Sequence, residues 1–234
     1  MARILIKEDK EFIWKSGDLH TNFGLVKEKD ILESNPKSNT GKDFLAFDAS
    51  FTDLLRYIHR GPATITPKDA AYICYFTGIN KSSKVVDAGA GCGILAASLA
   101  NFSKEVTSYE LNPEFLKIAK KNIDFLGVNN VNLKNNDIYE GIEEKNLDLI
   151  TLDLPEPWRV FKFSDSLKQS GWLVTYLPTI VQVMEAVGEA GKNRLYHFKT
   201  IELLEREWHI EGKKVRPKSS MIAHTAFLSF FRKI

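Results

Sequence analysis

The sequence VVDAGAGCG, from Val85 to Gly93, decides the fold of this chain. It begins as an apolar, β-branched run typical of a buried strand, and the helical pattern ILAASLA follows it. Its glycines at alternate positions, Gly89, Gly91 and Gly93, let the backbone turn tightly and approach a ligand. The first amides of the following helix point toward the same place. We therefore expect a strand, a ligand-binding loop and a helix, in that order.

Three more motifs follow apolar runs further along the chain: SYELN (108–112), NNDIY (135–139) and TLDLPEPW (151–158). Strands are expected at residues 84–89, 105–111, 130–137, 147–154 and 171–178, and helices at 68–79, 94–102, 113–127, 163–169 and 179–191. This alternation predicts an α/β fold with a mostly parallel sheet and right-handed crossovers. The acids Glu110, Asp137 and Asp153 then gather at the edge where open α/β sheets bind ligands.

The two ends of the chain have different patterns. Short apolar runs at 2–8, 11–15 and 20–32 predict a small β-rich, barrel-like domain over residues 1–62, and the Pro- and Gly-containing stretch 59–67 marks the junction. The domain at 63–234 ends in two long strands at 195–217 and 224–234, which we expect to form an antiparallel edge.

The glycine loop argues against a dinucleotide. The fingerprint G-x-G-x-x-G requires glycine at position 94, where this chain has Ile94. Glu110, at the end of the second strand, suits the two hydroxyls of an adenosine ribose, a role that NAD enzymes share with S-adenosylmethionine enzymes. Asp137, at the end of the third strand, can accept a hydrogen bond from an adenine amine. The series fits an adenosine laid across the strand ends, whereas any one of these motifs alone could be an ordinary turn.

Composition sets the broad class of protein. Of 234 residues, 44% are hydrophobic and 26% charged, as in a globular protein with a sizeable core. Cys74 and Cys92 have no disulfide or metal-ligand spacing, so we predict no metal site. No apolar stretch is long enough to cross a bilayer, and the N-terminus lacks the apolar core of a secretory signal, so we expect a cytoplasmic enzyme with no membrane partner.

The net charge of +2 conceals a local basic excess. Residues 1–60 contain ten Lys and Arg and ten Asp and Glu, whereas residues 192–218 contain eight against four. Such a segment can contact phosphates, although on charge alone a solvated lysine-rich face is the preferred explanation.

The glycine pattern and the acidic series over residues 68–234 resemble class I S-adenosylmethionine-dependent methyltransferases, which have a Rossmann-like fold. Three further stretches make the resemblance more specific: DLPEPW (153–158), RGPATITPKDAAYI (60–73) and RPKSSMIAHTAFLSFFRK (216–233). Together these stretches are similar to the tRNA adenine-N1 methyltransferase family, whose members modify adenine 58 of the T-loop and, in archaea, also adenine 57. The resemblance covers nearly the whole chain and accounts for the N-terminal β domain.

The resemblance also implies roles for individual residues. Asp153 would be the catalytic carboxylate at the target adenine, and tRNA would be the partner of a homotetramer. The S-adenosylmethionine site would comprise Asp87, Gly89, Gly91, Gly93, Glu110, Asp137 and Asp153. Substrate contacts would come from Arg60, Thr66, Trp158, Arg216 and Lys218. Thr66 departs from the family pattern, because other members often have a tyrosine or histidine there.

Two other interpretations remain open at this stage. A class I methyltransferase acting on a protein or a small molecule would keep the donor motifs but would leave DLPEPW and the segment from Arg216 unexplained. A non-catalytic tRNA-binding subunit of the same fold would have degraded donor motifs, whereas Gly89, Glu110 and Asp153 are all present here.

Overall fold

The computed structural model describes residues 2–33, 35–61 and 64–234, which form two compact units. The first unit extends to Ile58 and the second begins at His59. The boundary expected between residues 62 and 63 falls outside the described residues.

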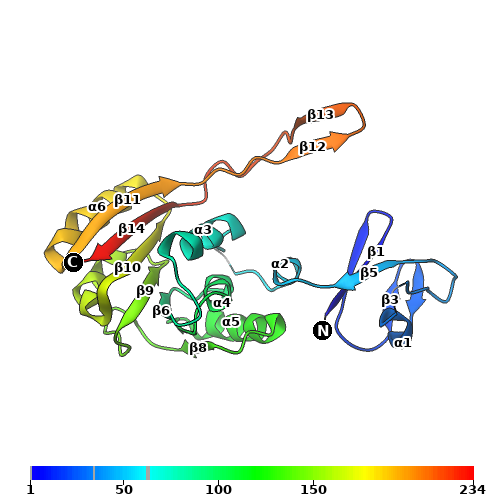
Figure 1. Ribbon diagram of the computed structural model, residues 1–234, viewed down its shortest axis with the longest axis horizontal. Helices are drawn as coiled ribbons and strands as arrows, with labels where there is room; N and C mark the ends of the chain where they lie inside the picture. The colour runs from blue at the N-terminus through cyan, green and yellow to red at the C-terminus, as the bar shows by residue number, and fades with distance from the viewer. Residues whose placement is uncertain (1, 34, 62–63) are drawn as a thin grey trace. The chain divides into compact units, whose positions relative to one another are not determined.

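The N-terminal unit is built from small antiparallel sheets (Figure 1). Strand β1 (Arg3–Lys7) lies between β2 (Lys10–Trp14) and β5 (Leu45–Asp48), and β3 (Leu19–Thr21) pairs with β4 (Gly24–Val26). Its core contains Leu5, Trp14, Val26, Ile31 and Phe44. The strand expected at 20–32 is wrong in its second half, because a helical turn, α1 (Glu28–Ile31), follows β4. The Asp18 side chain accepts the Glu28 amide at 2.9 Å, which favours this turn.

The second unit contains a seven-stranded sheet in the order β11-β14-β10-β9-β6-β7-β8. Strands β6 to β10 are mutually parallel where they pair, and β14 is antiparallel to both of its neighbours. The strands are β6 (Lys84–Ala88), β7 (Glu105–Tyr109), β8 (Val131–Lys134), β9 (Leu147–Leu152), β10 (Leu167–Leu177), β11 (Leu195–Glu202) and β14 (Phe227–Lys233). This is the Rossmann-like methyltransferase sheet with an antiparallel edge that the sequence predicts.

The helices are α3 (Pro67–Thr77), α4 (Ile94–Ala100), α5 (Pro113–Leu126) and α6 (Ile180–Ala190). Helices α3, α4 and α5 pack in a row, and α6 packs against β10, β14 and a 3-10 segment, η1 (Pro157–Ser166). A left-handed residue ends two of them, Gly78 after α3 and Gly127 after α5, because glycine adopts this conformation without steric cost. The core beneath α6 includes Ile150, Phe161, Leu173 and Phe231, all fully buried.

Two expected elements differ from the structure. The helix predicted at 163–169 is wrong: η1 covers its first part, and Leu167 already belongs to β10. Leu167 pairs with Leu147 and is buried, so packing of an apolar side chain outweighs the local helical pattern.

The long strand predicted at 195–217 is also wrong, because it divides after Glu202. The segment beyond forms a hairpin of β12 (Trp208–Glu211) and β13 (Lys214–Pro217), which extends away from the sheet (Figure 1). Gly212, at a φ of +55°, turns the chain between the two strands.

Candidate functional site

The glycine loop and the acidic residues gather at the carboxyl edge of the parallel strands. Ala88 of β6 is in register with Tyr109 of β7 and with Leu152 of β9. The next residue of each strand is Gly89, Glu110 and Asp153 respectively, so these three lie side by side. The parallel sheet that the sequence predicts therefore brings these residues together at one edge.

Gly89 is required because two backbones meet there. It has a φ of +85°, and a Cβ at this position would lie 2.1 Å from the Asp153 carbonyl oxygen. No side chain larger than hydrogen fits without moving one of the two loops. Gly93, at a φ of +82°, is the N-cap of α4 and packs against Ala119 of α5. The loop is thus held by the strand end on one side and by a helix on the other.

Glu110 is oriented by the loop that it faces. One carboxylate oxygen accepts the Gly91 amide at 2.8 Å, and the other accepts the Asn112 amide at 2.8 Å. A carboxylate oxygen can accept more than one hydrogen bond, so both oxygens keep acceptor capacity for a pair of hydroxyl groups. The geometry fits the vicinal diol of a ribose.

Two cavities share the Glu110 side chain. One, of about 250 Å³, is lined by the glycine loop, Glu110 and Asp153, together with Ile65 and Phe115. The other, of about 310 Å³, is lined by Glu110, Asp137, Tyr139 and neighbouring residues. Gly89, Glu110, Leu154 and Pro155 line both cavities. They therefore form one trough with Asp137 at one end, Asp153 at the other and Glu110 in the middle, which suits an elongated adenosine-containing ligand.

Asp153 has an unusual proton affinity. Burial raises the pKa of Asp153 to about 7, and the negative charges of Asp87 and Glu110 act in the same direction. A carboxyl group with these neighbours is stabilised by a positive charge brought close to it. A cationic group at this end of the trough would therefore be stabilised by the ionised form of Asp153.

Asp87 does not line either cavity, which differs from the expected cofactor contact. It is 1% exposed, and its carboxylate accepts Ser108 Oγ at 2.6 Å and Thr151 Oγ1 at 2.8 Å. Burial raises the pKa of Asp87 to about 6, against the opposing effect of these two hydrogen bonds. Its carboxylate ties β6 to β7 and β9 behind the loop, so it supports the site from within the sheet.

Two of the expected substrate residues share a cavity, because Thr66 and Lys218 both line one of about 420 Å³. Trp158 is half-buried against the core and lines neither part of the trough, so its substrate contact stays a prediction. Arg60 is exposed at the start of the second unit. Arg216 is exposed on β13, and Lys218 just beyond it forms an ion pair with Glu207. Thr66 donates its hydroxyl to Asp69 at 2.8 Å.

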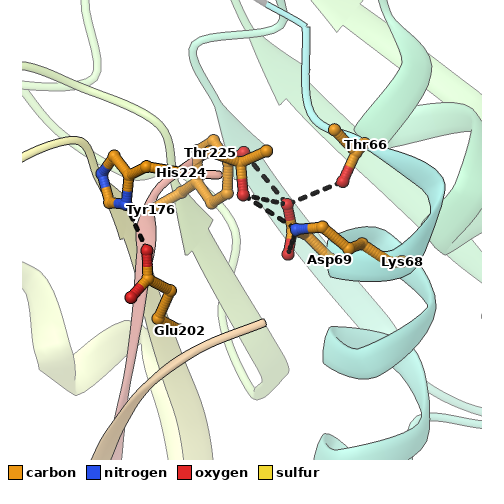
Figure 2. Close-up of polar contacts among 7 residues, drawn as sticks. All are labelled: Thr66, Lys68, Asp69, Tyr176, Glu202, His224 and Thr225. Atoms are coloured by element: carbon orange, nitrogen blue, oxygen red, sulfur yellow. Dashed lines mark hydrogen bonds and ion pairs between the residues drawn. The ribbon is translucent and has the colours of Figure 1, made fainter. Parts of the chain in front are cut away.

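Sequence reasoning missed two polar side chains near the trough. Asn122 of α5 donates to the carbonyl oxygens of Cys92 and His59, each at 2.8 Å, and accepts the His59 amide, which fastens the glycine loop. Tyr176, the penultimate residue of β10, lies beside Asp153 along the backbone, because Thr175 is in register with Leu152, the residue before Asp153. The Tyr176 hydroxyl contacts the buried carboxylate of Asp69 (Figure 2). An asparagine within a helix and a tyrosine within a strand carry no local motif that marks such contacts.

Two searches of the described residues gave negative findings. No group of three or more His, Cys, Asp or Glu side chains is placed to hold a metal ion in the part of the chain that the structure describes. Within the same residues, no helix has the length and apolar character needed to span a bilayer.

Comparisons with known proteins find relatives over most of the chain. The family model for the tRNA methyltransferase complex GCD14 subunit matches residues 55–229. The chain is 34% identical over 262 residues to the tRNA (adenine(57)-N(1)/adenine(58)-N(1))-methyltransferase TrmI of Methanocaldococcus jannaschii, covering 98% of this chain and 91% of the relative.

Two solved structures resemble the whole chain. The tRNA (m1A58) methyltransferase TrmI of Aquifex aeolicus has a TM-score of 0.83 at 27% identity and covers 100% of this chain and 97% of its own. A SAM-dependent O-methyltransferase of Thermotoga maritima has a TM-score of 0.87 at 29% identity and covers 100% and 92%.

Proposed function

The chain belongs to the family of the tRNA methyltransferase complex GCD14 subunit, and from this premise we propose that it methylates N1 of adenine in the tRNA T-loop. Adenine 58 is the first candidate position and adenine 57 the second, as in the name of the M. jannaschii relative. One observation carries the proposal: the trough at the strand ends combines a ribose-type acceptor, Glu110, with the half-buried carboxylate of Asp153, whose pKa is raised.

S-adenosylmethionine is the methyl donor that the fold and the family imply, and the residues of the trough fit it. Asp137 would accept from its adenine amine, Glu110 would accept from its ribose hydroxyls, and the loop at Gly91 would take its methionine portion. When bound, it supplies a methyl group on a positively charged sulfur. The raised pKa of Asp153 supports this assignment, because a cation at that end of the trough favours the ionised carboxylate.

Asp153 would act on charge that develops in the acceptor. Adenine N1 has its own lone pair, so the protein need not supply a covalent nucleophile. Methylation at N1 leaves the ring positively charged, and an ionised carboxylate beside it stabilises that charge and accepts from the exocyclic amine. The two prolines at 155 and 157 hold the following loop stiff, which keeps Asp153 in place. The chain's main contribution is alignment and electrostatics.

We further propose that tRNA contacts the exposed basic side chains of the second unit. Arg216 on the hairpin is the best candidate for a phosphate contact, since Lys218 already has the carboxylate of Glu207 as a partner. Arg60, near the start of the second unit, remains a candidate for another phosphate contact. We also propose that the protein acts in the cytoplasm.

A homotetramer is also part of the proposal, and the β12–β13 hairpin supports self-association. Its register places Trp208 opposite Pro217 and Ile210 opposite Val215, so one face of the ribbon is apolar. Trp208 is 54% exposed and Ile210 72% exposed. A two-stranded ribbon is only marginally stable in water, so this face is suited to contact another protein surface. Replacing Trp208 and Ile210 with serine should lower the mass measured by light scattering, whereas His209→Ser on the polar face should leave it unchanged.

The choice of acceptor tests the proposed function. The named activity of the T. maritima structure is O-methyl transfer, which favours a protein or small-molecule acceptor as the second candidate. Labelled methyl groups should enter an unmodified tRNA transcript and not a mixture of peptides and hydroxylated small molecules. Label in the second mixture alone would support O-methyl transfer, and donor binding with no transfer to any acceptor would support a non-catalytic subunit.

Glu110→Ala checks the donor site in the same assay. It removes two charge-assisted acceptors and should weaken S-adenosylmethionine binding by about 2 to 3 kcal/mol. Calorimetry should also detect no NAD binding by the unaltered protein.

A further inference from the structure

Asp69 of α3 is a fully buried carboxylate that none of the roles above uses. Figure 2 shows four donors converging on it. One oxygen accepts Lys68 Nζ at 2.8 Å. The other accepts the hydroxyls of Thr66 at 2.8 Å, Thr225 at 2.9 Å and Tyr176 at 3.2 Å. Asp69 therefore joins the start of α3, the end of β10 and the segment that leads into β14.

Stability alone is a weak reason for this arrangement. A buried carboxylate pays a large desolvation cost, and a buried ion pair is often no more stabilising than apolar side chains of the same volume. Hydrogen bonds from several directions do, however, fix the positions of the groups that donate them. The question is which of the donors needs a fixed position.

Tyr176 is the donor that lies at the reaction site. It follows Thr175, which is in register with Leu152, so its backbone lies next to that of Asp153, and the charge of Asp153 acts on its phenol. Burial raises the pKa of Tyr176, and the charges of Asp69 and Asp153 raise it further. The phenol therefore keeps its proton at neutral pH and acts as the donor toward Asp69.

We propose that Asp69 is a positioning residue for methyl transfer: by accepting the Tyr176 hydroxyl, it fixes the tyrosine ring as a wall of the acceptor site beside Asp153. The inference rests on the proposed function, because the wall is assigned to the site that would hold the target adenine of tRNA. Lys68 forms an ion pair with Asp69 and also donates to Thr225 at 2.9 Å, so the cation and the carboxylate are held together beside the tyrosine.

Asp69→Asn tests the proposal with little change in volume. The amide oxygen must face Lys68, because an ammonium group has no acceptor capacity. The amide NH₂ then faces the three hydroxyls, so Tyr176 loses its acceptor while Lys68 keeps one. The single-turnover rate at saturating tRNA and donor should fall about 10-fold to 100-fold, the range expected when a reacting group is misplaced by about 1 Å. The donor Kd should change by less than about twofold, because Asp69 is outside the trough.

A double-mutant cycle with Tyr176→Phe shows whether Asp69 acts through the phenol. The phenylalanine variant removes the hydroxyl and leaves the Lys68–Asp69 pair intact, so it should lower the rate by itself. Asp69→Asn added to it should cost less than about threefold more, because the two changes remove one shared contact. Thr225→Val is the matched control: it takes one hydroxyl from the same carboxylate oxygen, leaves the Tyr176–Asp69 bond and should lower the rate less than about threefold.

The outcomes separate this inference from the proposed function. A wild-type protein that methylates no tRNA adenine overturns both. If the wild type is active, each of three results overturns the positioning role alone. These are a near-wild-type rate for Asp69→Asn, an equal effect of that change in the Tyr176→Phe background, and a loss of rate in Thr225→Val equal to that in Asp69→Asn. If Asp69→Asn fails to fold, Tyr176→Phe decides: a wild-type rate with wild-type donor affinity contradicts the proposal.

Discussion

Asp153 is the residue to which we assign the electrostatic part of methyl transfer. Burial and the charges of Asp87 and Glu110 raise its pKa to about 7, well above the ordinary value of 3.8. At pH values between these two pKa values, Asp153 is protonated in the folded protein and ionised in the unfolded chain. The contribution of Asp153 to stability is therefore greatest at low pH and is lost as the pH rises toward about 7. The ionised carboxylate lowers the free energy of unfolding, and it is the form that we expect to act in methyl transfer.

A pH profile of methyl transfer checks this assignment. Because the ionised carboxylate stabilises the charged adenine, kcat/KM should rise as the pH passes through about 7 and then level off. Asp153→Asn keeps the size of the side chain without its charge, so it should lower the rate at least about 100-fold and flatten the profile. Donor binding should also tighten with pH in the wild type and not in this variant. A flat wild-type profile would place the titrating group elsewhere.

Residue positions could be predicted from sequence where a residue follows a strand directly. Gly89, Glu110 and Asp153 are next to one another for that reason. Asp87 and Trp158 lie outside the lining of the trough, because a motif does not reveal whether a side chain points into the sheet or out of it. The Asp69–Tyr176 contact joins residues 107 apart in sequence, and no local pattern predicts such a pair.

At the scale of elements, Gly89 and Gly78 form a matched pair. Both have left-handed backbones, but a Cβ on Gly89 would collide with the Asp153 carbonyl, whereas a Cβ on Gly78 would meet no atom within 4 Å. We expect Gly89→Ala to cost at least about 2 kcal/mol of unfolding free energy and to weaken donor binding. Gly78→Ala should cost about 1 kcal/mol and leave donor affinity unchanged. Chemical denaturation and calorimetry measure both, and equal donor affinities for the two variants would rule out the close approach at Gly89.

The sequence predicts the alternating strands and helices between residues 84 and 152 because the central strands are short, continuous apolar runs that are buried in the sheet, separated by helical patterns. Periodicity fails where tertiary contacts determine the secondary structure. Leu167 enters β10 to pack on Leu147, and η1 occupies the place of the expected helix. The stretch 195–217 alternates like one strand, but Gly212 folds its second half back on itself.

At the scale of the whole molecule, the basic excess of residues 192–218 makes a testable claim about RNA. Arg216→Ala should weaken tRNA binding and reduce the slope of log K against log salt concentration by about one, since one phosphate contact is lost. Lys192→Ala is the control within the same segment, because Lys192 pairs with Glu189 at 2.6 Å. Filter binding across a salt series measures both slopes. An unchanged slope for Arg216→Ala would remove the hairpin from the RNA contact surface.

The most direct test of the account is position-resolved mass spectrometry of nucleosides from a tRNA transcript treated with the protein and S-adenosylmethionine. We expect 1-methyladenosine in the T-loop fragment at position 58, with or without position 57, and its loss when Asp153→Asn replaces the wild type. Methylation at another atom of adenine or at a position outside the T-loop would contradict the account. So would an unchanged yield of 1-methyladenosine with Asp153→Asn.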